Sequence, residues 1–239
     1  MTISGTRIVL LGGTSGIGLA TAIAAAEQGA EVVVVSSRQS SVDAALAQLP
    51  ETAVGHAVDL TDSGALRGFF DSIGRFDHLV FTAGENLELM SLEEYDVDAA
   101  RTVFELRLFR ALESAHLAVP LLNEGGSIIL TSGAAALRPA AHLAVVAATG
   151  NAVIAAGKAL AVELAPIRVN VVVPGVVRSP LWNGMTADQQ EAMFAQASTT
   201  LPMGRVAEPA DVAKAYLALI EQDYVTGTAV VVDGGGVLV

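Results

Sequence analysis

Residues 10–18 read Leu-Leu-Gly-Gly-Thr-Ser-Gly-Ile-Gly, a glycine-rich stretch near the start of the chain. An apolar run, residues 8–11, leads into it, and a small-residue segment of helical composition, residues 19–27, follows it. Strand, glycine turn and helix in this order are typical of a loop that binds phosphate groups. The sequence therefore predicts a nucleotide-phosphate site at this turn.

The glycines of this turn have distinct expected roles. Gly12 and Gly16 can adopt backbone angles that other residues resist, and Gly18 allows the helix to pack close to the preceding strand. The helix that begins near Gly16 presents unpaired N–H groups and its positive dipole end to a pyrophosphate. We expect contacts to the pyrophosphate from the whole turn, namely Gly12, Thr14, Ser15, Gly16, Ile17 and Gly18.

The composition of the chain argues against several classes of function. Its 239 residues are 52% hydrophobic and 16% charged, which supplies a large core and predicts one domain over residues 1–239. A net charge of −12 disfavours nucleic acid, which needs a basic surface. The absence of cysteine excludes disulfides, thiolate catalysis and cysteine-bound metals. No metal site is predicted, because His56, His78 and His116 do not combine with carboxylates at ligand spacing.

Two segments bear on location in the cell. Residues 1–7 lead directly into the first predicted strand and leave no room for a signal peptide, so we expect a cytoplasmic protein. Residues 139–157 carry no formal charge, over a length close to that which spans a bilayer. This segment is mostly alanine and is interrupted by His142, Thr149 and Asn151, and a helix apolar on all sides is more often buried in protein. We therefore expect no membrane insertion.

Short β-branched runs alternate with helix-like segments along the chain. The predicted strands are residues 8–11, 31–35, 53–58, 77–81, 127–130, 167–173 and 229–232. Ser40 with Asp43 and Ser91 with Glu94 resemble capping boxes, and Thr61 or Asp62 is expected to cap a helix. A long helix is expected over residues 99–122, and residues 174–202 are expected to form a lid that holds a short helix. The alternation predicts an α/β fold with one parallel sheet and helices on both faces.

Several motifs, in this order, resemble those of the short-chain dehydrogenase/reductase family over residues 7–236. The glycine turn is similar to the family's Thr-Gly-x-x-x-Gly-x-Gly, with Leu11 in place of the threonine. Thr82-Ala83-Gly84 resembles its Asn-Ala-Gly turn, and Val58-Asp59-Leu60 resembles the segment whose aspartate touches adenine. The later segments that match are Ile167-Arg168-Val169-Asn170, Pro174-Gly175, Thr226-Gly227 and Asp233-Gly234-Gly235.

The resemblance implies a doubly wound Rossmann fold with about seven strands and a bound NAD or NADP. It also implies cofactor contacts from residues that follow later strands, at Asp59, Leu60, Ala83, Gly84, Pro174, Gly175 and Val177.

The end of the second predicted strand bears on the choice of cofactor. An acidic residue at that point binds the ribose hydroxyls of NAD and repels the extra phosphate of NADP. The sequence there is Ser36-Ser37-Arg38, in which two hydroxyls and a guanidinium suit a phosphate. Ser37 and Arg38 therefore favour NADP, with a solvated surface turn as the alternative interpretation of Arg38.

The positions that carry the family's chemistry are mostly replaced. Its members use a tyrosine as acid/base, a nearby lysine, a serine and an asparagine. Counting back from Leu160-Ala161-Val162-Glu163 places Val146 at the tyrosine position and Gly150 at the lysine position. Ser132 matches the serine, and Arg107 stands at the asparagine position.

Ser132 and Arg107 are therefore the predicted catalytic residues. Arg107 can bind an anionic substrate or stabilise a developing alkoxide, with a salt bridge or a solvated position as the alternative. Ser132 can donate a hydrogen bond to a carbonyl oxygen, or it is an ordinary residue at a strand end. His142, Glu85 and Asn86 are the other candidates for a proton donor.

Two functions are compatible with this pattern. The first is an NADP-dependent oxidoreductase for a small carbonyl, alcohol or imine, with a non-standard proton donor or none. The second is a non-catalytic nucleotide-binding protein, such as a redox sensor or a structural subunit. The full-length lid, which contains Trp182, favours the enzyme. The resemblance also implies a homodimer or homotetramer that pairs through the predicted helices at residues 99–122 and 143–164.

Overall fold

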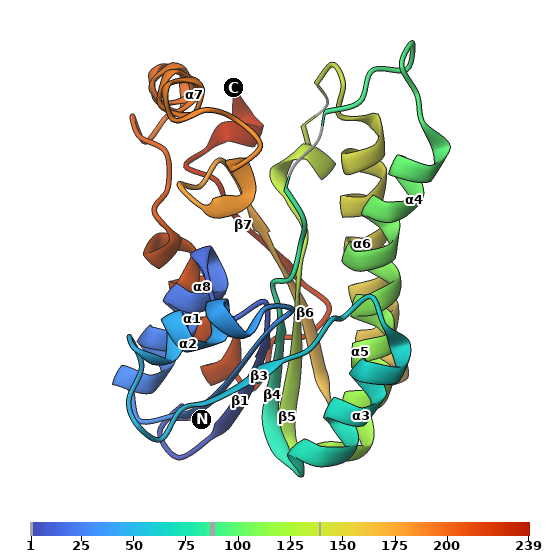
Figure 1. The fold of residues 1–239 in the computed structure, drawn as a ribbon, viewed down its shortest axis with the longest axis vertical. Coiled ribbons are helices and arrows are strands. Elements are labelled where there is room, and N and C mark those ends of the chain that lie inside the picture. The colour runs from blue at the N-terminus through green and yellow to red at the C-terminus, as the bar shows by residue number, and fades with distance from the viewer. Residues whose placement is uncertain (1, 87–88, 139) are drawn as a thin grey trace.

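Parallel strands form one seven-stranded sheet in the computed structural model, which describes residues 2–86, 89–138 and 140–239. Their order is β3-β2-β1-β4-β5-β6-β7, which confirms the predicted doubly wound α/β fold (Figure 1). The strands are β1 (Arg7–Leu11), β2 (Glu31–Ser36), β3 (Val54–Ala57), β4 (Phe76–Phe81), β5 (Leu122–Thr131), β6 (Arg168–Pro174) and β7 (Ala229–Val232).

Helices cover both faces of the sheet (Figure 1). One face carries α1 (Gly16–Glu27), α2 (Gln39–Leu46) and α8 (Pro209–Glu221). The other face carries α3 (Ser63–Ile73), α4 (Val97–Phe104), α5 (Ala111–Ala118) and α6 (Ala144–Glu163). A further helix, α7 (Ala187–Thr200), lies beyond the carboxyl ends of the strands.

Each face of the sheet has its own apolar core, because side chains along a strand point alternately to opposite faces. Ile8 and Leu10 of β1 pack in the core beneath α1 and α8. Val9 and Leu11 pack in the core beneath α3, α5 and α6. A strand that is buried on both faces reads as an unbroken apolar run, which is why β1 could be recognised in the sequence.

The helix caps agree with the sequence in part. Asp62 caps α3, since its carboxylate accepts hydrogen bonds from the backbone N–H groups at positions 64 and 65. The box predicted at Ser40 is wrong, because α2 begins at Gln39 after the extended residue Arg38, which makes no side-chain cap. Ser91 does accept a hydrogen bond from the N–H of Glu94, at 3.1 Å. No helix starts there, however, because α4 begins at Val97 and Asp96 is its cap.

The long helix expected over residues 99–122 is divided into segments. A six-residue π-helix, Glu105–Arg110, joins α4 to α5, and a 3-10 turn, Val119–Leu121, ends the run. Such π segments are frequent at functional sites because they redirect side chains within a helix. This one contains Arg107. The lid segment also differs from its prediction, because α7 has 14 residues and is not a short helix.

Among the described residues, α6 is the helix that is long and apolar enough to cross a membrane by length and composition. The core helix of a protein that enters no membrane passes the same test. α6 lies along β6, where a Cβ added to Gly157 would come within 2.5 Å of a Val171 methyl group. Pro139, the first residue of the apolar stretch in the sequence, lies outside the described residues.

Candidate functional site

The order of the strands determines where a ligand can bind. From β1 the chain moves outward to β2 and β3 and then returns to β4, which pairs with the other side of β1. In open α/β sheets the crevice at such a reversal, outside the carboxyl ends of the strands, is the usual ligand site. The glycine turn follows β1, and Thr82-Ala83-Gly84 follows β4, so both lie at this reversal.

The glycine turn is packed directly against the turn after β4. Gly12 has a φ of +89°, and a Cβ at this residue would lie 2.5 Å from the backbone nitrogen of Ala83. A Cβ at Gly18 would lie 2.2 Å from the carbonyl oxygen of Gly12 and 2.5 Å from the Thr82 hydroxyl. That hydroxyl donates to the carbonyl oxygen of Leu11 at 3.2 Å. Both glycines are therefore required by backbone conformation or close packing.

The N-terminus of α1 is suited to bind an anion. Ser15 precedes the helix in an extended conformation, and its side chain makes no cap. The first turn contains no acidic residue, so its N–H groups and the positive end of the helix dipole are not neutralised by a carboxylate of the helix itself. Ser179 and Pro180 cover Gly16, since a Cβ at Gly16 would lie 3.3 and 3.1 Å from their side-chain atoms. The turn residues thus fit the pyrophosphate that the sequence predicts.

An exposed arginine, Arg38, follows the end of β2. Ser37 and Arg38 are exposed where β2 gives way to α2. Within residues 2–86, 89–138 and 140–239, Arg38 has no ion-pair partner, whereas Arg107, Arg178 and Arg205 each do. The structure therefore leaves the Arg38 guanidinium available, as recognition of a phosphate requires.

The end of β3 holds one ionised side chain and one core side chain. The Asp59 carboxylate accepts hydrogen bonds from the Thr61 hydroxyl at 2.7 Å and from the Thr61 N–H at 2.9 Å. These two bonds, the hydroxyl first, hold the pKa of Asp59 below its ordinary value. Leu60 is 5% exposed, so its side chain belongs to the core and its backbone is what reaches the edge.

The loop after β6 contains the predicted cofactor residues Gly175 and Val177. Gly175 is tightly packed, since a Cβ there would lie 2.7 Å from the Asp233 Cα. Val177 is 3% exposed and forms a β-bridge with Ala207, so its side chain lies in the core and its backbone is the part that can contact a cofactor. The residue that reaches the glycine turn is Ser179. Sequence reasoning missed it because its closeness to Gly16 depends on the folded path of the loop.

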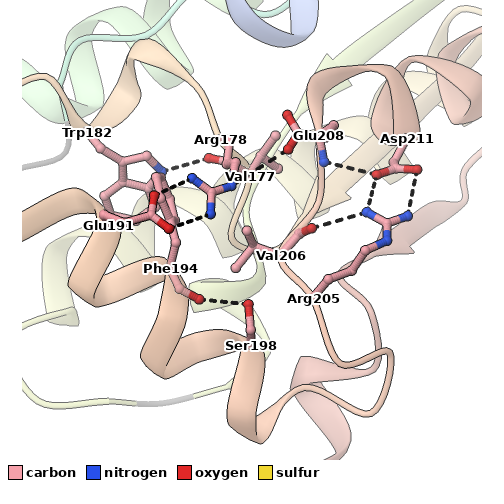
Figure 2. A network of polar contacts seen from close by, with 10 residues as sticks. All are labelled: Val177, Arg178, Trp182, Glu191, Phe194, Ser198, Arg205, Val206, Glu208 and Asp211. Carbon is pink, nitrogen blue, oxygen red and sulfur yellow. Dashed lines mark hydrogen bonds and ion pairs between the residues drawn. The ribbon is translucent and has the colours of Figure 1, made fainter. Parts of the chain in front are cut away.

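Arg178 holds α7 against this loop (Figure 2). Its guanidinium pairs with both carboxylate oxygens of Glu191, at 2.7 and 3.0 Å, and lies 4.5 Å from the centre of the Phe194 ring. The Trp182 indole donates to the Val177 carbonyl oxygen at 2.8 Å and meets Phe194 edge to face. Trp182 therefore fastens the start of the lid segment to the protein body.

A second arginine, Arg205, holds the loop that follows α7 (Figure 2). Arg205 pairs with both oxygens of Asp211 in α8, at 2.6 and 3.0 Å. The hydrogen bonds from Arg205 lower the pKa of Asp211 to about 2. One bidentate ion pair thus ties the loop before α7 to α7 itself, and another ties the loop after α7 to α8.

Ser132 follows β5 and lies against α6. Its hydroxyl donates a hydrogen bond to the carbonyl oxygen of Gly150 at 2.9 Å. A Cβ at Gly150 would lie 3.0 Å from the Ser132 hydroxyl oxygen and 2.9 Å from the Ala136 Cβ. The absence of a side chain at position 150 therefore gives Ser132 its close approach to the helix. Val146 lies in the first turn of the same helix.

Arg107 forms an ion pair with Glu85, the alternative that the sequence left open. Its Nε lies 3.2 Å from Glu85 Oε1, and its Nη2 donates to the Glu85 carbonyl oxygen at 2.7 Å. The guanidinium covers Gly84, at 3.1 Å from a Cβ built there. Glu85 Oε2 is buried and has no hydrogen-bond partner among the described residues. The pair thus lies over the turn after β4 with one acceptor oxygen unused.

The remaining candidate proton donors are placed as follows. His142 has a φ of +63°, which is uncommon outside glycine, and its carbonyl oxygen accepts a hydrogen bond from Met90. Its backbone therefore links the loop after β4 to the start of α6. Tyr216 is fully buried beside Thr131, 2.7 Å from its hydroxyl, and burial raises the pKa of this tyrosine. Tyr95 and Tyr224 are exposed.

Comparisons with known proteins agree over nearly the whole chain. A family model described as Enoyl-(Acyl carrier protein) reductase matches residues 12–236. The chain is 36% identical over 252 residues to Short-chain dehydrogenase/reductase ATR9 of Stachybotrys chlorohalonatus, and the match covers 99% of each chain. It is 35% identical to Short-chain dehydrogenase/reductase ucsE of Acremonium sp, over 97% of this chain and 95% of that one.

A solved structure gives the same result at the level of the fold. A small-chain dehydrogenase in complex with NADPH has a TM-score of 0.83 to this chain and is 35% identical to it. The match covers 98% of this chain and 99% of that protein. The described residues contain no group of three or more His, Cys, Asp or Glu side chains that could hold a metal ion.

Proposed function

The chain belongs to the short-chain dehydrogenase/reductase family, and from that premise we propose that it is an NADP(H)-dependent oxidoreductase for a small carbonyl, alcohol or imine. The oxidoreductase class is that of its named relatives. The single observation that carries the choice of NADP(H) is the exposed Ser37–Arg38 pair at the end of β2. Arg38 has no carboxylate partner among the described residues, and β2 ends without an acidic residue. The relative solved with NADPH supports the same choice.

The residues that would hold the cofactor lie along the carboxyl edge of β1, β2, β3, β4 and β6. The N-terminal turn of α1 binds the pyrophosphate, and Arg38 with Ser37 binds the ribose phosphate. Asp59 and the backbone of Leu60 approach the adenine, while Ala83 and Gly84 border the ribose beside the nicotinamide. On the loop after β6, the backbone of Val177 and the side chain of Ser179 complete this set. When bound, NADP(H) supplies or accepts a hydride.

The reaction end of the site is non-standard in this proposal. Val146 and Gly150 occupy the positions at which the family has its tyrosine and lysine, so the usual acid/base pair is missing. General acid catalysis contributes about 10²–10⁴-fold, which a well-positioned substrate can do without and still react slowly. Ser132 and Arg107 are the chain's own polar groups at this end. Ser132 contacts the reacting group of the substrate, and Arg107 with Glu85 borders it.

The proposal is tested by single-turnover mixing of the purified protein with NADPH and a panel of carbonyl and imine compounds. We expect oxidation of NADPH by at least one class of compound and a loss of at least about tenfold in rate for Ser132→Ala. Ser72→Ala on α3, far from the crevice, is the matched control and should react like the parent. NADPH binding without turnover of any compound would contradict the enzyme and favour a nucleotide-binding protein without catalysis.

We also propose that the protein is a homodimer or homotetramer paired through α6. The helix is apolar and rich in small residues, yet Val162 on it is 82% exposed in the single chain. A second copy of α6 would cover this face with a closely packed, symmetric interface. Light scattering should therefore give at least twice the chain mass, and Val162→Lys should lower that mass. A monomeric parent protein would contradict this proposal.

A further inference from the structure

We propose that the electrophile reduced at this site is a cationic iminium, whose N–H is bound by the hydroxyl oxygen of Ser132 and by Glu85 Oε2. The inference rests on the proposed oxidoreductase function and specifies its substrate class. Two hydrogen-bond acceptors and the absence of an acid at the reaction end carry it.

The hydroxyl proton of Ser132 is already committed. A carbonyl oxygen can only accept, so the 2.9 Å contact between Ser132 Oγ and the Gly150 carbonyl oxygen requires the serine to donate. The hydroxyl has a single proton, which leaves its lone pairs to face any other partner. Ser132 in this arrangement accepts from an N–H and has no proton for a ketone oxygen.

Glu85 supplies the second acceptor. One of its carboxylate oxygens binds the Nε of Arg107 at 3.2 Å. The other, Oε2, is buried and has no hydrogen-bond partner within the part of the chain that the structure describes. A buried carboxylate oxygen without a hydrogen bond is costly, because it has lost water and gained nothing in exchange. A substrate N–H that carries positive charge would satisfy it with a strong, charge-assisted bond.

The two acceptors belong to one end of the site. β4 and β5 are adjacent parallel strands, and Val80 pairs with Ile129. Glu85 follows β4 by a few residues and Ser132 follows β5 directly, so both lie at the same carboxyl edge of the sheet. The π-helix that carries Arg107 contacts α6, which carries Gly150. Strand ends, π-helix and α6 therefore meet around the same space.

An iminium also removes the need for a proton donor. Its carbon accepts a hydride, with the electron pair of the C4–H bond of the reduced nicotinamide, and the C=N π pair becomes the nitrogen lone pair. The products are a neutral amine and the oxidised cofactor, and no proton is transferred. A ketone that accepts the same hydride becomes an alkoxide and requires an acid. Position 146 is a valine, which has no proton to give.

The charges around the site are compatible with a cation. Arg107 is paired with Glu85, and its charge is offset by the Glu85 carboxylate and carbonyl oxygens. The ion pair with Arg107 uses Glu85 Oε1 and leaves Glu85 Oε2 without a hydrogen bond among the described residues. The chain as a whole carries a net charge of −12, which attracts cations from solution.

The test compares two bicyclic compounds of similar size, protonated 3,4-dihydroisoquinoline as the iminium and α-tetralone as the ketone. Single-turnover mixing with the NADPH-loaded protein should reduce the iminium at least about 100-fold faster than the ketone. A second readout is the calorimetric affinity of the NADPH-loaded protein for tetrahydroisoquinolinium, a saturated ammonium ion that NADPH cannot reduce. Glu85→Gln should weaken this affinity about 10- to 100-fold, and Ser132→Ala should weaken it to a smaller extent.

Glu93→Gln is the matched control, because it removes the same charge from an exposed carboxylate of the same loop. It should bind the ammonium ion as the parent does. Equal reduction of the ketone, or equal weakening by Glu85→Gln and Glu93→Gln, would overturn the inference and leave the oxidoreductase function standing. Failure to bind NADPH at all would instead overturn the proposed function, and the iminium inference with it.

Discussion

The glycine turn after β1 and the strand end after β5 lie on one edge of the same sheet, yet they are built in different ways. At the turn, Gly12 and Gly18 approach backbone atoms so closely that a Cβ would lie within 2.5 Å of them. After β5, Ser132 binds the Gly150 carbonyl oxygen through its side chain, and over the neighbouring turn after β4 the side chain of Arg107 pairs with Glu85. The cofactor end is therefore fixed by the fold itself, and the reaction end by the choice of side chains.

This difference has a consequence for function. A binding turn made of backbone atoms cannot change without disrupting the fold, so the glycine motif that forms it can still be recognised in the sequence. Side chains at the reaction end can be exchanged without changing a strand or a helix, since Val146 and Gly150 fit within an unbroken α6. A chain of this kind can keep its cofactor and change its substrate. The predictions below test the two ends separately.

The largest effect is expected at the cofactor end. Gly18→Ala would place a methyl group 2.2 Å from the Gly12 carbonyl oxygen, and neither backbone can move away without opening the turn. We expect a loss of more than about 3 kcal/mol in the free energy of unfolding, together with loss of NADPH binding. Urea unfolding and calorimetry measure the two quantities. Gly68→Ala in α3, where a Cβ meets open space, should instead be neutral or stabilising by up to about 1 kcal/mol.

The strands beneath the reaction end should give the protein a pH-dependent stability. His78 is 1% exposed and its Nδ1 lies 2.9 Å from the Ser127 hydroxyl, and burial, followed by the charge of Arg168, lowers its pKa to about 4. The unfolded chain takes up this proton near the ordinary pKa of about 6.5, whereas the folded chain resists it down to the lowered value. Stability from this group is therefore complete above the ordinary pKa and is lost as the pH falls towards the lowered one.

Protonation of His78 should lower the free energy of unfolding by up to about 3 kcal/mol. Urea unfolding at about pH 7 and about pH 4.5 measures it, with His78→Asn as the variant that cannot take up the proton. The parent should lose more stability than the variant between these two conditions. An equal loss in both proteins would show that carboxylates alone set the acid sensitivity.

The choice of cofactor should depend on Arg38. Arg38→Ala removes the guanidinium proposed to bind the extra phosphate, so NADPH affinity should fall about 10- to 100-fold while NADH affinity stays the same. Calorimetric titration measures both affinities. Arg67→Ala, which removes an exposed arginine from α3, should leave both unchanged. A loss of NADPH affinity in both variants would point to net charge and not to a specific contact.

The smallest effect is expected in the lid segment. Arg178→Lys keeps the positive charge but loses the bidentate geometry with Glu191 and the flat contact with Phe194 (Figure 2). The ion pair is partly open to solvent at Arg178 and exposed at Glu191, so we expect an increase of less than about threefold in the rate of proteolysis within residues 178–208. Limited proteolysis measures this rate. A loss of global stability would contradict the view that this pair holds the segment locally.

The fold could be predicted from the sequence because its signals are local. β1 is an apolar run, α1 follows a glycine turn, and Asp62 caps the helix that it precedes. The cap predicted at Ser40 failed because Arg38, without any side-chain cap, already starts α2. The π-helix was missed since its apolar spacing resembles that of an ordinary helix.

The site could be predicted in part. The turn residues and Ser132 lie at strand ends as the sequence predicts, because each follows a recognisable strand, and their roles stay predictions. The position of Arg107 was predicted by counting along the chain. Its partner Glu85 is 22 residues away, and no periodic pattern links the two. Ser179 was missed for a similar reason, because the fold of the lid segment brings it to Gly16. Contacts between distant residues depend on the folded chain, and local patterns do not contain them.

Calorimetric titration of the purified protein with NADPH and, separately, with NADH tests the central claim most directly. The account holds that the cofactor end is intact and selects the phosphorylated nucleotide, whatever has changed at the reaction end. It predicts that NADPH binds at least about tenfold more tightly than NADH. Failure of both nucleotides to bind, or equal affinity for the two, would contradict it.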